Sequence, residues 1–446
     1  MSLDEKAAYQ LLGDLLGLAR KVAPGADVQL VLNTGRNANT RFAASEITST
    51  GDVEETEIQV GVTFGRRHAE ATTNQTDPAS LGALLERVVQ MARIVPEDPE
   101  LQPMLGAQKY PSVPPSYDPA IERLGAAERA AAAASAIAAA EAAQVAAAGF
   151  YSHSVGALAL ANSAGLRAYH RQTLAHFTLT ARTHDSTGSG WAGAVADRLA
   201  DIDPRRVAAT AIDKAVRSAK PRRLEPGRYT VVLEPAAVAD LLGFLAGSLG
   251  ARAADEGRSF FARPGGGTRI GEKLFDESIT LRSDPAEPGQ PSAPFDVEGF
   301  PLRPYTWIER GTLRALTYSR FWAAKKGQQP TGAPRGFHLL GGQASREDLL
   351  KGVERGLLVT RFWYTRYLDP QTITITGLTR DGVFLIEKGE IVAPVNNFRF
   401  NESPVNMLKN VEALSRETVR SPFAPNVRAP ALRTREFNFA SISEAV

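Results

Sequence analysis

The sequence contains no cysteine, and this absence removes several kinds of chemistry. Without thiols the chain forms no disulfide, offers no thiolate nucleophile and cannot build a zinc site that needs a sulfur ligand. Histidine is also scarce. There are six histidines, none of which is followed by glutamate, and no two stand four or five positions apart. Helical zinc motifs built on histidine pairs are therefore excluded.

Net charge is almost absent as well. The 51 lysines and arginines are balanced by 49 aspartates and glutamates, which leaves a formal charge of +2. A protein that binds nucleic acid directly usually carries a strong basic patch, so this composition does not favour direct binding of nucleic acid. Hydrophobic residues make up 43% and charged residues 22%, which is typical of a globular protein.

A long uninterrupted apolar run is missing too. The N-terminal stretch carries Asp4 and Glu5 within a helical pattern, whereas a signal peptide needs a continuous apolar segment behind a basic start. The most apolar stretch, Tyr229–Phe261, is interrupted by Glu234 and Asp240 and does not suit a membrane span. We therefore expect a cytoplasmic protein that does not contact a membrane.

What is present divides into two halves. The length of 446 residues predicts two domains, and the Pro-rich segment Lys220–Gly227 is the best boundary. Residues 1–222 alternate apolar and polar positions between turns, with further helical segments, which predicts an antiparallel meander with helices. Residues 223–446 combine short β-like runs with one apolar helix. We predict an α+β fold, with a mostly antiparallel C-terminal β domain around a central buried helix.

Two segments of the first half have an unusual composition. The proline-rich residues 95–119 predict a surface connection, because proline interrupts regular structure. The alanine-rich run that follows predicts a helix on propensity alone. Its Ile137 and Val145, on a background of small residues, favour a helix packed closely on a sheet over a linker.

Three histidines are candidates for a metal site. His170, His176 and His184 all stand at even positions and could share one face of extended strands. However, His170 and His176 lie about 20 Å apart on one strand by the usual rise, so they cannot bind one ion unless the chain bends. Half-exposed strand histidines are the favoured interpretation.

Two acidic residues form a second candidate. Asp296 and Glu298 alternate onto one face if this segment is extended, and could act as a general acid and base. The alternative is a turn in which Asp296 caps the chain before Gly299, and this interpretation is favoured.

The C-terminal residues carry a family resemblance. The passage from Gly356 to Ser415 contains FRFNESP at residues 398–404, and it resembles the signature region of the TldD/PmbA family, the "modulator of DNA gyrase" proteins. ANSAGL at residues 161–166 and FDVEGFPLRPYTWIERGTLRALTYSRF at residues 295–321 resemble the same family. The resemblance extends over nearly the whole chain.

The resemblance implies a two-domain α+β protein of peptide processing. In this family a TldD-type subunit is a zinc metallopeptidase with an H-E-x-x-x-H motif on a helix and a C-terminal cysteine, and a PmbA/TldE-type subunit pairs with it. We aligned the family pattern on residues 257–261, which follow the apolar helix. In this alignment Leu242 and Gly247 take the places of the two histidines, and Gly243 takes the place of the glutamate. The resemblance therefore implies no cofactor in this chain, with zinc only in a TldD-like partner.

The helix itself permits a physical prediction. A helix that is apolar on nearly every face is normally buried. Gly243 and Gly247 each cost about 1 kcal/mol relative to alanine in a helix, and their G-x-x-x-G spacing predicts a close approach of another element. We expect a core helix in preference to a residual ligand site.

We expect a metal-free PmbA/TldE-like subunit that acts as a partner or holds peptide. Strand addition at an exposed sheet edge suits unfolded or leader peptides, because main-chain hydrogen bonds demand little of the sequence. The resemblance nominates a set of residues for peptide contact, namely Asn397, Arg399, Asn401 and Glu402. The alternative is a loop capped by Ser403 that leads into a helix from Pro404 to Leu414.

Other functions stay open at this point. One is a self-sufficient peptide hydrolase that uses Asp296, Glu298 and a histidine. Another is a regulatory binding protein linked to DNA gyrase. The partner is expected to be a TldD-like subunit, a second copy in a two-fold dimer, or each in turn.

Overall fold

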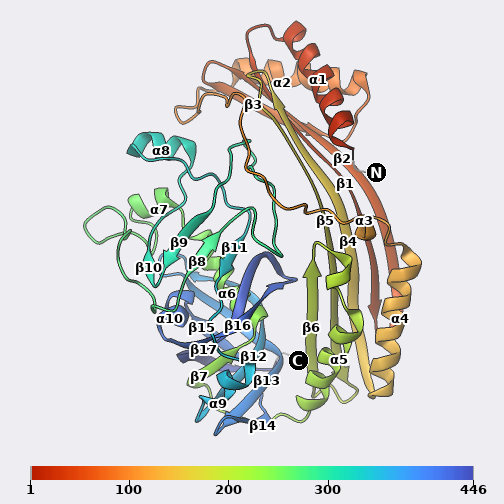
Figure 1. Ribbon diagram of the computed structural model, residues 1–446, viewed down its shortest axis with the longest axis vertical. Helices are drawn as coiled ribbons and strands as arrows, with labels where there is room; N and C mark the ends of the chain where they lie inside the picture. Colours follow the sequence, from red (N-terminus) through yellow and green to blue (C-terminus); the bar gives the residue numbers. More distant parts are fainter. Residues whose placement is uncertain (1–2, 445–446) are drawn as a thin grey trace.

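Two β-sheets organise the chain in a computed structural model that describes residues 3–444 (Figure 1). The first sheet is built from strands between residues 27 and 196, and the second from strands between residues 227 and 443. Helices and strands follow one another without a regular alternation, and the predicted α+β class is confirmed. The expected domain boundary at residues 222 and 223 falls in the connection between the two sheets.

The first sheet is a long, curved, antiparallel wall with the strand order β3-β2-β1-β4-β5-β6 (Figure 1). Alternating side chains give it two different faces. The outer face is apolar and packs on helices, and the inner face turns toward the second half of the chain. Its strands are β1 (Asp27–Ala43), β2 (Glu46–Phe64), β3 (Arg67–Thr73), β4 (Val145–Asn162), β5 (Arg167–Thr183) and β6 (Ser189–Ala196).

Five α-helices pack against the outer face of this sheet. Four of them begin at an aspartate whose carboxylate accepts a backbone N–H of the first turn, and this capping explains where the helices start. The caps are Asp4, Asp77, Asp118 and Asp203. The helices are α1 (Glu5–Val22), α2 (Pro78–Ile94), α3 (Pro119–Glu122), α4 (Ala126–Ala142) and α5 (Pro204–Arg217), and a 3-10 turn η1 (Leu199–Asp201) precedes α5.

The alanine-rich helix α4 packs on the sheet as predicted. Ala133, Ala136 and Ile137 are buried against the outer face, where small side chains allow a close approach. The placement of Val145 in this helix was wrong. The helix ends at Ala142, Gln144 adopts a left-handed conformation with φ 58°, and Val145 begins strand β4.

The second sheet has eleven strands, and all its pairings are antiparallel except β11 with β17 and β12 with β7. Its strands are β7 (Gly227–Leu233), β8 (Leu281–Ser283), β9 (Tyr305–Glu309), β10 (Thr312–Leu313), β11 (Phe337–Leu339), β12 (Arg355–Asp369), β13 (Thr374–Glu387), β14 (Glu390–Pro394), β15 (Asn397–Glu402), β16 (Val411–Ser421) and β17 (Ala424–Ser443). Its helices are α6 (Pro235–Gly247), α7 (Ala251–Asp255), α8 (Arg320–Lys326), α9 (Arg346–Lys351) and α10 (Pro404–Lys409).

Five strands of the second sheet close into a ring. Strand β7 pairs with both β12 and β17, so the order β7-β12-β13-β15-β17 returns to its start. Phe362 packs against Phe400 and Phe437, with centroid distances of 4.4 and 5.6 Å, and α6 belongs to the same core. The central buried helix is thus confirmed. Neither α6 nor any other helix within residues 3–444 is long and apolar enough to cross a membrane.

The proline-rich segment was only partly predicted. It lacks strands and α-helices between Val95 and Asp118, but it does not simply run over the surface. The hydroxyl of Tyr110 donates to the carbonyl of Gly299 at 2.9 Å, and Ser116 is buried beside Gln172 of β5. This segment therefore passes between the first sheet and loops of the second half (Figure 1).

Candidate functional site

Helix α6 is the element that the family resemblance aligns with a zinc helix, and its residues do not fit a zinc ion. Leu242 is fully buried in the core, and Gly243 and Gly247 have no side chain that could bind a metal ion. Asp240 is the one titratable side chain of the helix. Across residues 3–444, no three His, Asp or Glu side chains are arranged to hold a metal ion.

The predicted close packing at the two glycines is wrong. Apart from the two adjacent residues and the backbone of the helix itself, a Cβ atom added at Gly243 or Gly247 would meet no atom within 4 Å. The ring of Phe244, which lies between them in the sequence, is partly buried against the core and meets the ring of Tyr367 edge to face, with 4.9 Å between centroids. Helix α6 is therefore a core helix on one side and open on the other.

The residues nominated for peptide contact lie on β15, which is paired on both edges, by β13 and by β17. Strand alternation places Asn397, Arg399 and Asn401 on one face and Glu402 on the other. The carboxylate of Glu402 is buried, and it accepts hydrogen bonds from the backbone of Ser403 and Asn438. The four residues do not converge on one site, and Glu402 has a structural role.

The capped-loop alternative is confirmed at its cap only, because residues 397–402 form strand β15 and not a loop. The hydroxyl of Ser403 accepts the backbone N–H of Val405 at 3.2 Å, and Pro404 is the first residue of α10. The helix is shorter than predicted, because it ends at Lys409 and Val411 begins strand β16.

Asp296 and Glu298 do not form an acid–base pair. One oxygen of Asp296 accepts the backbone N–H groups of Glu298 and Phe300, each at 3.0 Å, as predicted for a capped turn. Glu298 pairs with Arg320 at 3.0 Å. Within residues 3–444, neither carboxylate forms a hydrogen bond or an ion pair with a histidine.

The three even-numbered histidines also have separate environments. Burial lowers the pKa of His176 to about 4, with Arg420 nearby, and His184 lies exposed at the end of β5. His170 belongs to a cavity on the inner face of the first sheet. Among residues 3–444, these three histidines do not form a cluster that could hold a metal ion.

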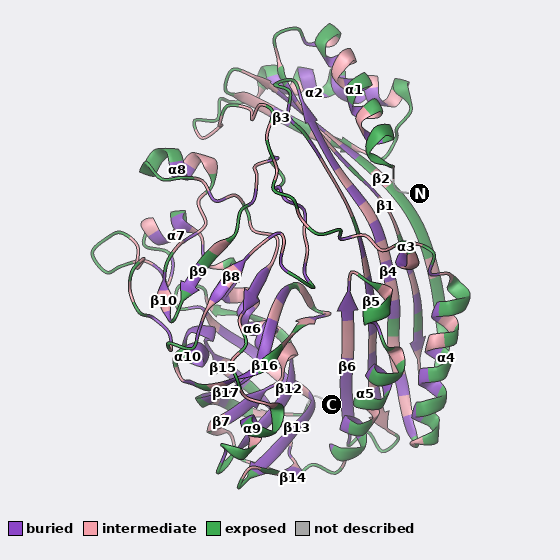
Figure 2. Cartoon of the chain, in the orientation of Figure 1, coloured by how far each residue is buried: buried purple, intermediate pink, exposed green. Residues whose placement is uncertain are grey.

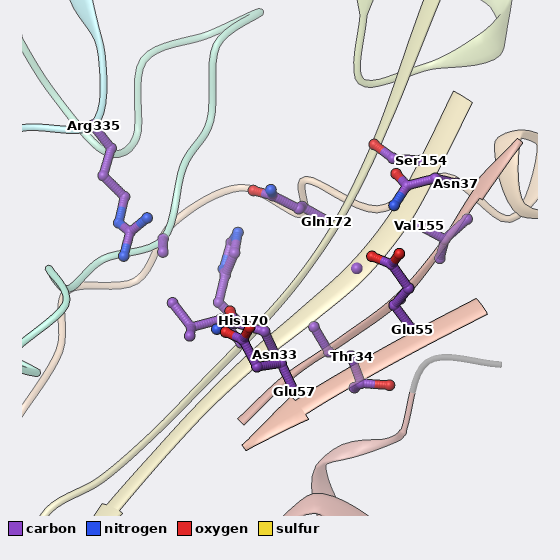
Figure 3. A pocket seen from close by; sticks show the side chains of 15 residues that line it. Asn33, Thr34, Asn37, Glu55, Glu57, Ser154, Val155, His170, Gln172 and Arg335 are labelled. Carbon is purple, nitrogen blue, oxygen red and sulfur yellow. The ribbon is translucent and has the colours of Figure 1, made fainter. Parts of the chain in front are cut away.

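This cavity is a candidate site, because polar side chains from both halves of the chain border it. It has a volume of about 440 Å³ and lies between the inner face of the first sheet and residues Ala293 and Arg335 of the second half (Figure 3). Polar side chains from four adjacent strands line it, namely Asn33, Asn37, Glu55, Glu57, Ser154, His170 and Gln172. A hollow with convergent polar groups is the usual form of a small-ligand site.

Strand register explains why the sheet is hollow here. Gly35 of β1 pairs directly with Gly156 of β4, so two adjacent positions on the inner face lack side chains. Their row continues to Glu55 of β2 and Gln172 of β5. The floor of the cavity is bare backbone, and its walls are the polar residues of the neighbouring rows.

The two sides of the cavity differ in charge. Arg335 reaches in from the second half, opposite Glu55 of β2 (Figure 3). Burial lowers the pKa of His170 to about 4, and Arg335 adds to this effect, so the imidazole is neutral at pH 7. Burial also lowers the pKa of Arg335 below its ordinary value, although Asp296 opposes this shift. Arg335 stays charged because an arginine titrates far above neutrality.

We expect the two floor glycines to respond differently to substitution. In Gly35→Ala the new Cβ would lie 2.5 Å from the carbonyl oxygen of Val155, so the variant should lose about 1–3 kcal/mol of stability. In Gly156→Ala the nearest atom is the carbonyl oxygen of Thr34 at 3.8 Å, so this matched variant should be at least as stable as the parent. Thermal unfolding of both measures the difference, and equal melting temperatures would contradict it.

Comparison with known proteins gives a consistent result. Two family models match, the PmbA/TldA metallopeptidase central domain at residues 110–219 and the C-terminal domain at residues 226–441. Metalloprotease PmbA of Escherichia coli O157:H7 is 24% identical over 433 residues, which cover 91% of this chain and 90% of that protein. A metalloprotease of Methanothermobacter thermautotrophicus is 29% identical over 223 residues, or 45% of this chain and 46% of that one.

Solved structures share the fold. TldE from Thermococcus kodakarensis superposes with a TM-score of 0.86 at 18% identity, and covers 96% of this chain and 100% of its own. A Thermotoga maritima protein, described as a candidate modulator of a DNA gyrase, superposes with a TM-score of 0.85 at 19% identity, and covers 97% of this chain and 100% of its own.

Proposed function

Because the chain belongs to the PmbA/TldD metallopeptidase family, we propose that it is a metal-free, PmbA/TldE-like subunit of a peptide-processing complex. It holds peptides, and a TldD-like partner supplies the zinc and the cleavage. The complex works in the cytoplasm and does not bind nucleic acid directly.

One observation carries the metal-free part of the proposal. Helix α6 has the position of the family's zinc helix in our alignment, but its open side presents Gly243 and Gly247. A catalytic zinc site needs three nitrogen, oxygen or sulfur donors that converge on the ion. On α6, Asp240 alone could contribute one.

The edge of the first sheet supports the peptide-holding part. Strand β3 pairs only with Ile58–Phe64 of β2, so within residues 3–444 no strand flanks the outer edge of residues 46–57. These residues are exposed on both faces for most of their length (Figure 2). A free edge of this kind can pair with an extended peptide. This free edge adjoins the cavity, because Glu55 and Glu57 belong to the edge and also line the cavity.

A surface on β12 supports the partner. Large apolar side chains are exposed there by 40–67%, next to the open side of α6, where Tyr367 meets Phe244. Exposed apolar clusters commonly mark protein interfaces. The members are Trp363, Tyr364, Tyr367 and Leu368. The partner on this surface is a TldD-like subunit, and a second copy of this chain is the alternative.

The proposal predicts where zinc and cleavage occur. The purified chain alone should bind far less than one zinc per molecule and should not cleave an unfolded peptide. A TldD-like protein purified with it should bring stoichiometric zinc and cleavage that a chelator stops. Metal analysis and a peptide-cleavage assay on the chain, the partner and their mixture measure both. Stoichiometric zinc in this chain alone would contradict the proposal, and chelator-resistant cleavage by it alone would favour a self-sufficient hydrolase.

A further inference from the structure

Two buried nitrogen atoms in the cavity lack hydrogen-bond partners in the described part of the chain. Nη2 of Arg335 and Nε2 of His170 are buried, and neither has a hydrogen-bond partner among residues 3–444. Nε of Arg335 is fixed by the carbonyl of Phe295 at 2.8 Å, which orients the guanidinium. An unsatisfied buried polar group costs about 1–3 kcal/mol. Such groups at one side of a cavity therefore indicate a ligand that accepts hydrogen bonds.

A carboxylate is the acceptor that these groups fit best. Guanidinium groups bind carboxylates through charge-assisted, often paired hydrogen bonds. His170 is neutral at physiological pH, and its Nε2 can donate to the same anion when the proton is on that nitrogen. Neutral histidine also adds no second positive charge beside Arg335. This side of the cavity thus suits one carboxylate.

The other side of the cavity suits a cation. Glu55 and Glu57 of β2 line it, and neither forms an ion pair with any residue between 3 and 444. Arg36 is the nearest arginine along the paired strand, but it is engaged with Asp52. Two unpaired carboxylates next to a polar hollow attract a basic group.

The separation between the two sides sets the size of the ligand. Glu57, Asn33, Leu158 and His170 stand in one row across four adjacent strands. Three interstrand spacings correspond to about 14 Å. An extended peptide advances about 3.3 Å per residue, so about four residues span this distance. Gly35 and Gly156 line the cavity without side chains, which leaves room for the peptide backbone.

We propose that this cavity binds the C-terminal end of a peptide. The α-carboxylate lies on Arg335 and His170, and a basic side chain at about the fourth residue from the C-terminus lies on Glu55 and Glu57. The inference rests on the proposed peptide-holding function and specifies its ligand. The amide side chains of Asn33, Asn37 and Gln172 hydrogen-bond to the main chain between the two ends, so the intervening residues can vary.

Calorimetric titration of the purified full-length chain tests the site. The probe is N-acetyl-Lys-Ala-Thr-Ala with a free carboxylate, and the comparison peptide carries a C-terminal amide instead. We expect the free acid to bind at least tenfold more tightly than the amide. Replacing the lysine by norleucine should weaken binding severalfold. Equal affinity of acid and amide, or no binding of either peptide, would overturn the proposal.

Variants assign the two ends. Arg335→Gln should bind acid and amide equally weakly, and Arg335→Lys should keep part of the preference and serves if Arg335→Gln does not fold. The double variant Glu55→Gln/Glu57→Gln should bind the lysine and norleucine peptides equally. Matched controls are Arg303→Gln and Glu86→Gln, which remove exposed charges outside both the cavity and the free edge of β2 and should behave like the parent. Parent-like acid preference in Arg335→Gln would overturn the assignment.

This result is separable from the proposed function, because titration uses the chain alone. Equal binding of acid and amide by a chain that still supports cleavage by a TldD-like partner would overturn the cavity site only. Carboxylate-dependent binding by a chain that carries its own zinc would overturn the metal-free function and leave the site intact.

Discussion

Replacing Asp381 by asparagine should lower the free energy of unfolding by about 3 kcal/mol, because it leaves a buried arginine without its counter-ion. Asp381 and Arg361 are only 2% and 3% exposed, and Nη1 of Arg361 lies 3.4 Å from Oδ2 of Asp381. Asparagine keeps the size of the side chain and tolerates the left-handed backbone at this position, where φ is 56°. The substitution therefore removes the charge and little else.

The pair also joins the two sheets, which is why the effect should extend beyond its own strands. The hydroxyl of Ser189, on β6 of the first sheet, donates to Oδ1 of Asp381 on β13 of the second. The guanidinium of Arg361 lies against the rings of Trp191 of β6 and Phe423 of the β16–β17 turn, at 4.9 and 4.7 Å from their centroids. Charge, hydrogen bond and ring contacts thus converge where the halves meet.

Calorimetry and chemical unfolding of Asp381→Asn measure the loss. Ser189→Ala is the matched control, because it removes the hydrogen bond to Asp381 and leaves the ion pair; it should lose only about 1 kcal/mol. If both variants unfolded like the parent, the ion pair would contribute nothing to the junction. If Ser189→Ala lost as much as Asp381→Asn, the hydrogen bond would matter more than the charge.

The fold class followed from local patterns, but the cavity did not. The alternation of apolar and polar residues along a strand, and the composition of a helix, depend on residues that are close in the sequence. These local patterns predicted the meander, the helices and the burial of α6 in the core. The cavity depends on Gly35 lying beside Gly156, and that pairing is set by the register of two strands far apart in the chain. Arg335 comes from a loop without a motif, so nothing near it indicated its position.

Two errors at the candidate sites have identifiable causes. The spacing of Gly243 and Gly247 is the same whether another element packs on them or the side is left open, and the structure has the open arrangement. Residues 397–402 form a strand, not a loop, and the alternation that separates Asn397 from Glu402 was available in the sequence. The prediction of a loop for these residues concealed the alternation of their side chains between the two faces.

Asp240 of α6 should make the stability of the chain fall as pH rises. Burial raises the pKa of Asp240 to about 7, although Arg361 and the backbone N–H of Phe362, which donates to Oδ2 at 3.4 Å, favour the charged form. In the unfolded chain the pKa of an aspartate is about 4. Between about pH 4 and 7 the folded state therefore holds a proton that the unfolded state has released.

The sign of the effect follows from this difference. Stability decreases with rising pH wherever the folded state binds more protons, so the contribution of Asp240 is largest below pH 4 and is lost as pH approaches 7. Each unit of pKa difference corresponds to about 1.4 kcal/mol. Since an amide side chain does not titrate, Asp240→Asn should match the parent near pH 4 and exceed its stability by about 2–4 kcal/mol at pH 8.

The comparison must be a difference between variant and parent at each pH, because other buried groups titrate in the same range. Burial raises the pKa of Glu402 and lowers that of His153 to about 4, and both contribute equally to the two proteins. Urea unfolding at pH 4.5, 6 and 8 measures the difference. Asp240 also attracts Arg361, so the gain should shrink toward the lower value if that attraction is strong. A constant difference across this range would mean that Asp240 ionises in the folded chain as it does in the unfolded one.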